Sequence, residues 1–315
     1  MQRVRYVSSL PIRSFSTFGR LKSSRAQIID GKKVASSVRQ ILAEGVEREK
    51  SRNSAFLPFL AIVQVGNRED SNVYVRNKIR AAEQIGMKAE HIRLPNTASQ
   101  SDVVNQIEDL NQNPAIHGML LQLPLDTTSP IDSGLCTQAI HPAKDVDGLH
   151  TDNAGKLAHG ELQRCIIPCT PRGCLELIKS TGVEVTGKRA VVIGRSKIVG
   201  SPMSSLLLWN HATVTTCHSK TKDLAGVCSE ADILIAAVGK AQLVKAGWVK
   251  PGAVVIDCGI NAVDGRLIGD VDFESVKEVA SWITPVPGGV GPMTVAMLLQ
   301  NTFESAKRFQ ASNSG

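Results

Sequence analysis

Apolar and polar residues follow one another along the chain in blocks that predict helices and strands in turn. From residue 34 to 46 apolar residues recur every three or four positions, which is typical of an amphipathic helix. The run LPFLAIVQVG (57–66) is apolar and rich in strand-forming residues, and it ends in glycine, as a buried strand often does. Segment 70–86 begins with Asp and Ser, which can cap a helix, and closes on Gly86, so we expect a helix there.

The same alternation continues to the end of the chain. Strands are expected at 88–94, 116–125, 189–194, 212–219, 231–239 and 253–261, and helices near 101–112, within 166–182, at 203–210 and at 293–310. Strands that alternate with helices predict parallel sheets. The prolines at the start of 166–182 suit a crossing between two units, and 283–292 reads as a Gly/Pro loop. We therefore predict an α/β protein of two domains, with the last helix returning to the first domain.

The first 29 residues differ from the rest of the chain. They contain six Arg or Lys residues and no acid, with Ser and apolar residues interspersed, which is typical of an organelle transit peptide. We expect residues 1–27 to be cleaved on import into the mitochondrial matrix. A plastid is the less favoured destination because Arg is so frequent, and a disordered basic tail is the alternative.

Charge and cysteine content narrow the function classes. The first 29 residues supply six of the seven net positive charges, so the remainder carries only +1 and lacks the basic footprint that nucleic-acid binding needs. No apolar run approaches the roughly 18 residues of a membrane span. The seven cysteines are an odd number without a CxxC pair, which argues against a disulfide framework. Cys165 and Cys169 lack a second ligand pair, so we expect no metal.

A strand, a glycine loop and a helix in succession indicate a dinucleotide site. In VVIGRSKIVGSP, Gly194 ends the strand and Gly200 opens the helix, whose free amides can bind a pyrophosphate. Ser196 stands where the usual GxGxxG pattern has its middle glycine, so an ordinary tight turn fits this loop equally well. The strands that alternate after it favour the nucleotide interpretation.

The end of the next strand bears on which nucleotide binds. An NAD site usually presents an acid about 20 residues after the loop. Here the strand ends in TTCHSKT without an acid, and Arg195, Ser219 and Lys220 offer positive charge and hydrogen bonds. This combination favours a 2′-phosphate, hence NADP. The alternative is that Arg195 and Lys220 are solvated surface charges.

Tyr74 and Lys78 form a second candidate site. Four residues apart on a helix, they project from the same face. The YxxxK pattern also occurs in short-chain dehydrogenases, but there it follows the glycine loop, whereas here it precedes Gly194 by more than 100 residues. The pair therefore belongs to a different domain from the nucleotide. A surface aromatic with a snorkelling lysine is the alternative.

Further polar groups stand at predicted strand ends. Gln122 interrupts the apolar run LLQLPL, so its burial demands a partner. Asp145 and Asp147 lie in KDVDG, which also suits an ordinary tight turn. The loop TPVPGGVGP has the backbone freedom to approach a flat ligand, or it simply joins the domains.

Taken together, these segments resemble the bifunctional methylenetetrahydrofolate dehydrogenase/methenyltetrahydrofolate cyclohydrolase family. The resemblance runs in order from about residue 28 to 310 and is closest to the dehydrogenase/cyclohydrolase portion of eukaryotic one-carbon tetrahydrofolate synthases. The large synthetase domain of those proteins is absent from this sequence. The segments that carry the resemblance are SNVYVRNKIRAAEQIG, LLQLPL, KDVDGLH, PCTPRGCLELI, GRSKIVGSPM, TVTTCHSKT and ITPVPGGVGPMTVAMLL.

The resemblance implies a division of the chain into domains. It implies an N-terminal three-layer α/β catalytic domain that binds folate (28–170 plus 293–312) and a Rossmann-like NADP-binding domain (171–292). No insertion separates LLLWN from ATVTT, unlike in mitochondrial NAD-preferring relatives, which supports NADP. The family also implies a homodimer formed through the nucleotide domains.

The resemblance further implies roles for single residues. Lys78 would be the catalytic residue, Tyr74 would stack on the folate, Gln122 would position Lys78, and Asp147 would bind the pterin ring. The coenzyme would contact Gly194, Arg195, Ser196, Gly200, Ser219 and Ile260. The folate cleft would be lined by Pro287, Gly288 and Gly289.

The implied chemistry requires one adaptable acid/base group. Lys78 can serve only if its pKa falls far below the reference value of about 10.4. Burial and a cationic substrate would lower this pKa and a nearby Asp would raise it, and the sequence leaves the balance open. An NAD-preferring or dehydrogenase-only member of the family is the nearest alternative. A non-catalytic folate- or nucleotide-binding protein is disfavoured because Tyr74, Lys78, Gln122 and Asp147 are all present.

Overall fold

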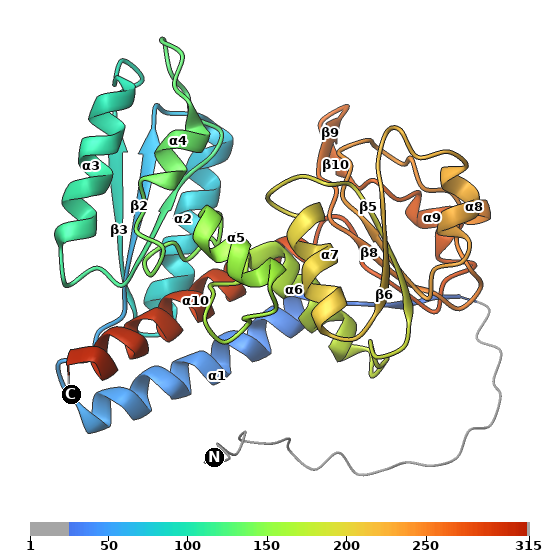
Figure 1. Cartoon of the computed structure of the whole chain (residues 1–315), viewed down its shortest axis with the longest axis horizontal. Coiled ribbons are helices and arrows are strands. Elements are labelled where there is room, and N and C mark those ends of the chain that lie inside the picture. Colours follow the sequence, from blue (N-terminus) through green and yellow to red (C-terminus); the bar gives the residue numbers. More distant parts are fainter. Residues whose placement is uncertain (1–24, 314–315) are drawn as a thin grey trace.

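The computed structural model describes residues 25–313 of the chain. Two lobes lie side by side in Figure 1, each built on a sheet covered by helices. Two long helices, α1 (Gly31–Arg52) and α10 (Val290–Asn313), extend from the base of the first lobe toward the second. None of the helices within residues 25–313 has the length and apolar content needed to cross a bilayer.

The first lobe has three layers around a parallel sheet. Its strands are, in spatial order, β3 (Lys88–Leu94), β2 (Phe59–Val65) and β4 (Gly118–Leu121). Successive side chains of β2 point to opposite faces, and all are buried because both faces are covered. Leu60 and Ile62 pack toward one layer of helices, and Ala61 and Val63 toward the other. These layers are α1, α2 (Glu69–Gln84) and α10 on one face, and α3 (Gln100–Gln112) and α4 (Ser133–Gln138) on the other.

The second lobe contains a six-stranded parallel sheet. In spatial order its strands are β1 (Gln27–Ile28), β11 (Trp282–Ile283), β8 (Val254–Asp257), β7 (Ile233–Ala236), β5 (Arg189–Ile193) and β6 (Thr213–Cys217). Val192 and Ile235 pack toward one layer of helices, and Val191 and Leu234 toward the other. These layers are α6 (Cys169–Ser180) and α7 (Gly200–Trp209) on one face, and α8 (Leu224–Cys228) and α9 (Phe273–Val276) on the other.

Strand β5 is the point at which the strand order reverses. The chain passes from β5 through α7 to β6, and then crosses to β7 on the other side of β5. Such a reversal opens a crevice at the carboxyl ends of the strands, where α/β proteins bind nucleotides. The shorter elements nearby are α5 (Thr151–Ala158), the 3-10 helix η1 (Ala246–Trp248) and a hairpin of β9 (Asn261–Val263) and β10 (Arg266–Ile268).

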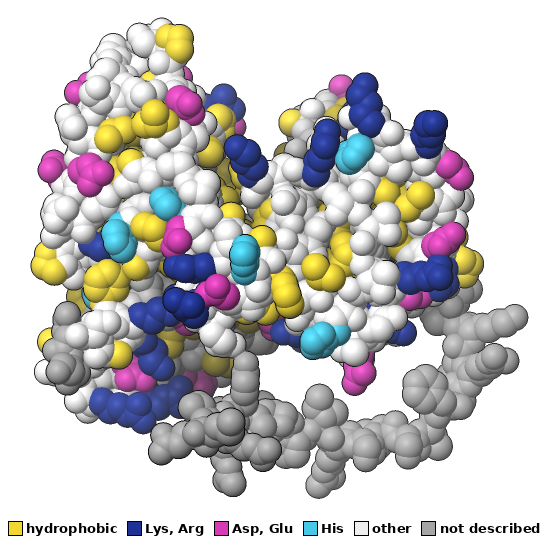
Figure 2. Space-filling view, in the orientation of Figure 1, with side chains coloured by type: hydrophobic (Ala, Val, Ile, Leu, Met, Phe, Trp, Pro, Cys, Tyr) yellow, Lys and Arg dark blue, Asp and Glu magenta, His cyan; other side chains and the backbone are white. Residues whose placement is uncertain are grey.

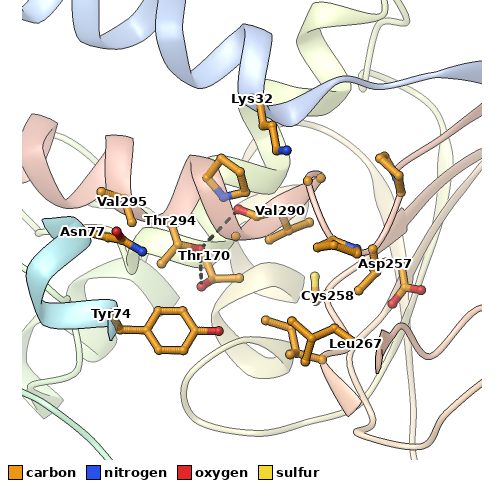
Figure 3. A pocket seen from close by; sticks show the side chains of 18 of the residues that line it. Lys32, Tyr74, Asn77, Thr170, Asp257, Cys258, Leu267, Val290, Thr294 and Val295 are labelled. Atoms are coloured by element: carbon orange, nitrogen blue, oxygen red, sulfur yellow. Dashed lines mark hydrogen bonds between the residues drawn. The ribbon is translucent and has the colours of Figure 1, made fainter. Parts of the chain in front are cut away.

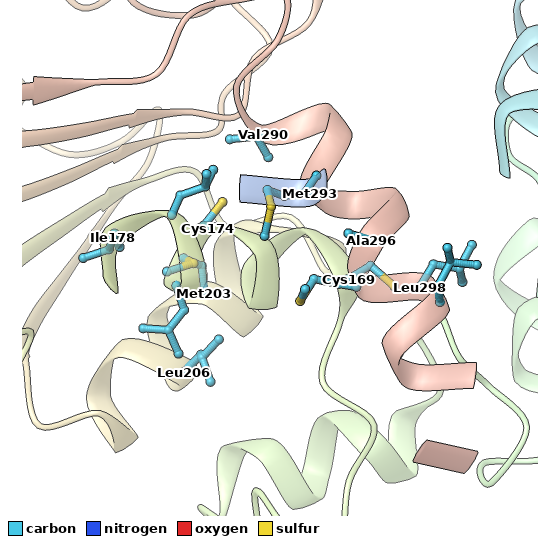
Figure 4. Close-up of a cluster of buried hydrophobic side chains, with 14 of the residues drawn as sticks. Cys169, Cys174, Ile178, Met203, Leu206, Val290, Met293, Ala296 and Leu298 are labelled. Atoms are coloured by element: carbon cyan, nitrogen blue, oxygen red, sulfur yellow. The ribbon is translucent and has the colours of Figure 1, made fainter. Parts of the chain in front are cut away.

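One hydrophobic cluster joins the two lobes. Met293 on α10 belongs to one buried cluster with Cys174 and Ile178 on α6 and with Met203 on α7 (Figure 4). The same cluster continues through α10 to Leu60 in the first sheet, so the lobes share part of their core. The predicted return of the last helix to the first lobe and the predicted two-domain α/β fold are both confirmed.

Several boundaries differ from the prediction. Strand β4 ends at Leu121 and β8 at Asp257, so the strands expected at 116–125 and 253–261 are shorter, and 261–268 is a separate hairpin. The expected loop 283–292 takes in the end of β11 and the first turn of α10. Helices α4, α5, α8 and α9 are four to eight residues long, too short for an apolar period to show in the sequence.

The folded unit begins earlier than the predicted leader boundary. Residues 1–24 lie outside the described part of the chain. Ala26 and Gln27 were expected in the leader, but their amides donate to the carbonyls of Lys277 (2.6 Å) and Ser281 (2.8 Å), and Gln27 opens β1. Gln27 pairs with Trp282 of β11, so the described fold includes a residue that was expected in the leader, and the cleavage of residues 1–27 stays a prediction.

Candidate active site

Lys78 and Gln122 meet where α2 faces the end of β4. Lys78 Nζ donates a hydrogen bond of 2.9 Å to Gln122 Oε1. Gln122 is 9% exposed, and its Nε2 donates at 2.8 Å to the carbonyl of Leu123. This second bond orients the amide so that its oxygen faces Lys78. The partner that burial of Gln122 demands is therefore the lysine.

Burial of the Lys78 ammonium lowers its pKa, and the negative charge of Asp147 opposes this shift. The sequence leaves open whether burial or Asp147 has the larger effect on this pKa. In the structure burial has the larger effect, because the pKa lies below its ordinary value. The Cys169 thiol lies beside the same two groups, and burial raises its pKa well above the usual range. The thiol therefore stays protonated, and Asp147 is the charge that acts on Lys78.

The turn that carries Asp147 is held by buried polar groups. Lys144 is 3% exposed and donates from Nζ to the carbonyls that end α3, those of Leu110 (3.2 Å), Asn111 (2.7 Å) and Asn113 (2.7 Å). A cation at this place satisfies carbonyls that the helix leaves unpaired. Gly148 has φ +75°, and a Cβ there would lie 2.7 Å from the nitrogen of Pro168, so the turn requires glycine.

Asp145 anchors the same turn. It is fully buried and accepts hydrogen bonds from the amides of Gly148 (3.1 Å) and His150 (2.8 Å) and from Asn153 Nδ2 (3.0 Å). Burial raises the pKa of Asp145 to about 7, although these bonds favour the carboxylate. Of the two acids in KDVDG, Asp145 is thus committed to the fold, and Asp147 is the one placed near Lys78.

Asn301 ties the last helix to this turn. Its Nδ2 donates to the carbonyls of Val146 (2.8 Å) and Ile167 (3.0 Å), and its Oδ1 accepts from Arg172 Nη1 at 2.6 Å. Arg172 also forms a two-pronged ion pair with Glu304, at 2.6 and 2.9 Å. Sequence reasoning did not identify these residues. The sequence offered one clue to Asn301: it lies four residues after Met297, which lies four residues after Met293, and all three are buried on the same helix.

A cavity of about 500 Å³ lies between the lobes beside Tyr74. Figure 2 shows the lobes divided by a notch. In Figure 3 the Tyr74 ring projects from α2 into the cavity, toward Leu267 of the second lobe, and the hydroxyls of Thr170 and Thr294 are bonded at 3.0 Å within it. Four residues expected at the folate or the coenzyme also line this cavity, namely Ile260, Pro287, Gly288 and Gly289.

A second cavity, of about 790 Å³, lies between the lobes next to the coenzyme loop. It is lined by Ser196 of that loop and by Leu123 and Gly148, which directly follow Gln122 and Asp147. The predicted catalytic residues other than Tyr74 line neither cavity. Lys78 is on α2, which lines the first cavity, and Gln122 and Asp147 directly precede residues that line the second cavity.

The glycines of the coenzyme loop allow neighbouring backbone segments to pack closely against one another. Gly194 has φ +119°, and a Cβ there would lie 2.1 Å from the carbonyl oxygen of Ala237. A Cβ on Gly200 would lie 2.3 Å from the oxygen of Gly194. Ser196 Oγ accepts from the amides of Val199 (3.2 Å) and Gly200 (3.4 Å), so the serine in the middle-glycine position braces the loop.

Arg195 and Ser219 lie at the same edge of the second sheet. Ile193 and Cys217 are paired neighbours on β5 and β6, and each candidate follows its strand by two residues. Both side chains are exposed, and within residues 25–313 Arg195 has no acidic partner within 4.0 Å. An exposed cation and a hydroxyl at the carboxyl ends of neighbouring parallel strands fit the 2′-phosphate of NADP.

Two buried carboxylates hold the neighbouring loops, a feature absent from the sequence prediction. Asp257 accepts from the amides of Gly259, Asp270 and Val271, each at 2.9 Å, and burial raises its pKa to about 6. Asp270 accepts from the amides of the loop after β7, which are those of Val238 (2.7 Å), Gly239 (3.0 Å) and Lys240 (2.9 Å). The sequence offered one clue to this arrangement, since Asp257 directly follows the apolar run AVVI.

Comparison with known proteins decides the family. Residues 29–147 match the family model described as "Tetrahydrofolate dehydrogenase/cyclohydrolase, catalytic domain", and residues 168–310 match its "NAD(P)-binding domain" counterpart. This chain belongs to the tetrahydrofolate dehydrogenase/cyclohydrolase family. The family predicted from the motifs is confirmed.

Individual members of the family resemble this chain over about 90% of its length. It is 56% identical over 291 residues to human "C-1-tetrahydrofolate synthase, cytoplasmic", covering 90% of this chain but only 31% of that protein. It is 53% identical over 284 residues to "Bifunctional protein FolD" of Moorella thermoacetica, covering 90% of this chain and 99% of that one. The solved Trypanosoma brucei methylenetetrahydrofolate dehydrogenase-cyclohydrolase, complexed with NADP cofactor and inhibitor, superposes with TM-score 0.84 at 40% identity, covering 90% and 98% of the two chains.

Replacing Asn301 with Leu tests the bracing of the Asp147 turn. The variant leaves the carbonyls of Val146 and Ile167 buried without their donor, so we expect the free energy of unfolding to fall by about 2 to 4 kcal/mol. Urea unfolding followed by circular dichroism measures the change. Thr302→Val is the matched control: Thr302 is equally buried on α10, but its hydroxyl donates only within the helix, to Leu298. Equal losses in the two variants would contradict the bracing role.

Proposed function

We propose that this family member oxidises 5,10-methylenetetrahydrofolate to 5,10-methenyltetrahydrofolate with NADP and hydrolyses the product to 10-formyltetrahydrofolate. The observation that carries the proposal is the Lys78 amine, bonded to Gln122 and lowered in pKa beside Asp147. Family membership supports the paired reactions, and the NADP-complexed relative supports the coenzyme.

The oxidation depends mainly on how the folate and the coenzyme are oriented relative to one another. When bound, the coenzyme accepts a hydride from the methylene bridge of the folate. Loss of that hydride leaves a cation spread over two nitrogens of the folate. Tyr74, which projects into the cleft, offers a ring face to the flat part of the substrate, and an amine of lowered pKa avoids a second positive charge beside the cation.

The hydrolysis requires proton transfer in both directions. Water attacks the methenyl carbon and loses a proton, and the departing ring nitrogen gains one. A single amine can accept the first proton and donate the second if its pKa lies near the working pH. Gln122 holds Nζ of Lys78 in place, and the charge of Asp147 stabilises the protonated form between the two transfers.

The coenzyme loop supports NADP over NAD. Gly194 and Gly200 allow the loop to pack closely at the start of α7, where the pyrophosphate would bind, and Arg195 and Ser219 would bind the 2′-phosphate. An NAD-preferring or dehydrogenase-only enzyme is the second candidate. Initial rates with each coenzyme, followed through both methenyl and formyl products, distinguish the candidates.

Assembly and location are further parts of the proposal. A homodimer through the second lobes is supported by β6, which within residues 25–313 is an edge strand that pairs only with β5. Sedimentation equilibrium tests the dimer. Import into the mitochondrial matrix is supported by the basic, acid-free start of the sequence. Fusing residues 1–27 to a fluorescent protein tests import, with plastid or cytosolic fluorescence as the contrary results.

Lys78→Met should abolish the hydrolysis and damage the oxidation less. The thioether cannot carry a proton, so we expect cyclohydrolase turnover to fall by about 10³-fold or more and dehydrogenase turnover by about tenfold. Separate assays of methenyl hydrolysis and NADPH formation measure the two effects. Arg76→Met, an exposed change on the same helix, is the control. Full cyclohydrolase turnover in Lys78→Met would refute the role of the amine.

Asp147→Asn should shift the pH dependence of the hydrolysis. The unprotonated amine is the active base, so the rate rises with pH through the pKa of Lys78. Asp147 raises that pKa, and its neutralisation therefore lowers it further and moves the rising limb toward lower pH. We expect the KM for folate to rise about tenfold as well, because a charged hydrogen bond is lost. A limb displaced to higher pH, or left in place, contradicts this assignment.

Arg195→Ala should weaken NADP selectively. Loss of a charged contact to the 2′-phosphate is expected to raise the KM for NADP by about 10- to 100-fold. The KM for folate and the rate with NAD should change little, since NAD lacks that phosphate. Steady-state kinetics with both coenzymes provides the measurement. Equal increases in the KM for NADP and for folate would count against the assignment.

A further inference from the structure

Two thiols meet at the wall of the cavity that Tyr74 lines. Cys174 lies on α6 and Cys258 directly follows β8, and their sulfurs are hydrogen-bonded at 3.4 Å. The two residues are 84 positions apart in the sequence, so the fold brings them together. The sulfurs are not joined covalently in this structure. The proposed reactions use neither thiol.

The two thiols differ in their access to solvent. Of the seven cysteines, all within residues 25–313, six are buried and Cys258 is only partly buried. Cys258 lines the cavity, and Figure 3 shows its sulfur there. Cys174 is 0% exposed and belongs to the cluster that joins the lobes (Figure 4). A small reagent that enters the cavity therefore meets Cys258 first.

We propose that Cys258 is a site of oxidation by hydrogen peroxide and that Cys174 converts the oxidised form into a Cys174–Cys258 disulfide. In the first step the sulfur of Cys258 attacks a peroxide oxygen, the O–O bond breaks, and one water leaves with the thiol proton. The product is a sulfenic acid. In the second step the sulfur of Cys174 attacks that of Cys258, the S–O bond breaks, and a second water leaves. The two thiols lose two electrons, and the peroxide is reduced to two waters.

The first of these steps limits the rate. The bond from Cys174 and burial raise the pKa of Cys258 well above its usual range, and the charges of Asp257 and Asp270 add to this effect. Since the thiolate is the reactive form, peroxide attacks slowly at neutral pH. The second step is fast, because the sulfur of Cys174 already lies 3.4 Å from its target. The sulfenic acid is therefore short-lived.

The disulfide disturbs the coenzyme side of the cavity. Its formation shortens the distance between the sulfurs from 3.4 Å to about 2.05 Å, so the segment at Cys258 and α6 must approach each other. The next residue, Gly259, has little room, because a Cβ there would lie 2.3 Å from Asp270 Oδ1. Asp270 holds the loop after β7, and Ile260 was expected at the coenzyme. A shift of this segment therefore reaches groups around the coenzyme and lowers dehydrogenase turnover.

Mass spectrometry of the full-length enzyme after peroxide treatment tests the pair. With free thiols blocked and no reductant present, a digest should contain the peptides of Cys174 and Cys258 joined together, lighter than their sum by two hydrogens. Dehydrogenase turnover with NADP should fall about tenfold in parallel, and dithiothreitol should reverse both changes. Absence of the joined peptides overturns the proposal, and so does their formation with turnover unchanged.

Two variants separate the roles of the thiols. In Cys174→Ala the oxidation should stop at the Cys258 sulfenic acid, which dimedone traps in greater yield than in the wild type. Cys258→Ser should give neither joined peptides nor a dimedone adduct at Cys174, because Cys174 is buried. Cys228→Ala, a buried cysteine elsewhere in the second lobe, is the matched control and should form the joined peptides as the wild type does. An adduct at Cys174 in Cys258→Ser overturns the proposed order of the two steps.

Discussion

The proposed chemistry depends on a lysine ammonium that is partly withdrawn from water. Transferring an ammonium from solvent to a protein interior favours its neutral form, and this is the effect that prevails at Lys78. A lysine at the reference pKa of about 10.4 is almost wholly protonated near neutral pH, so a base at this position requires a lowered pKa. Asp147 limits the effect without reversing it. An amine that is neither fully charged nor permanently neutral is what a reaction with two opposite proton transfers needs.

The surrounding structure keeps this balance by fixing both partners. Gln122 is held by its bond to the Leu123 carbonyl, and the Asp147 turn is fastened by Lys144, Asp145 and Asn301. Asn301 comes from the last helix, whose other contacts build the core shared by the two lobes. The distance between the first-lobe amine and the second-lobe coenzyme loop is therefore set by the same packing that stabilises the fold.

The sequence predicted the long helices and the buried strands well, but it did not predict single side-chain contacts between distant segments. Buried strands such as β2 and long helices such as α2 have periods that show in the residues, and the order of Gly194 and Lys78 along the chain separated the lobes. Asn301 and Arg172 were missed because their partners lie more than 100 residues away in the sequence, and the Asp257–Asp270 pair because its role depends on how the loops fold around it. Residues 26 and 27 were missed because a two-residue strand has no period, and its backbone pairing with β11 leaves no mark in side-chain type. The sequence suggested that Gln122 needs a partner, but burial had to be seen before the direction of the Lys78 pKa could be decided.

The most direct measurement is a titration of Lys78 itself. Protein labelled with ¹⁵N at lysine side chains, followed by NMR across the alkaline range, reports the pKa of each amine, and the spectrum of Lys78→Met assigns the resonance. We expect Lys78 to lose its proton at a lower pH than the exposed lysines, whose reference pKa is about 10.4. A Lys78 that titrates together with the exposed lysines, or above them, would contradict the central claim.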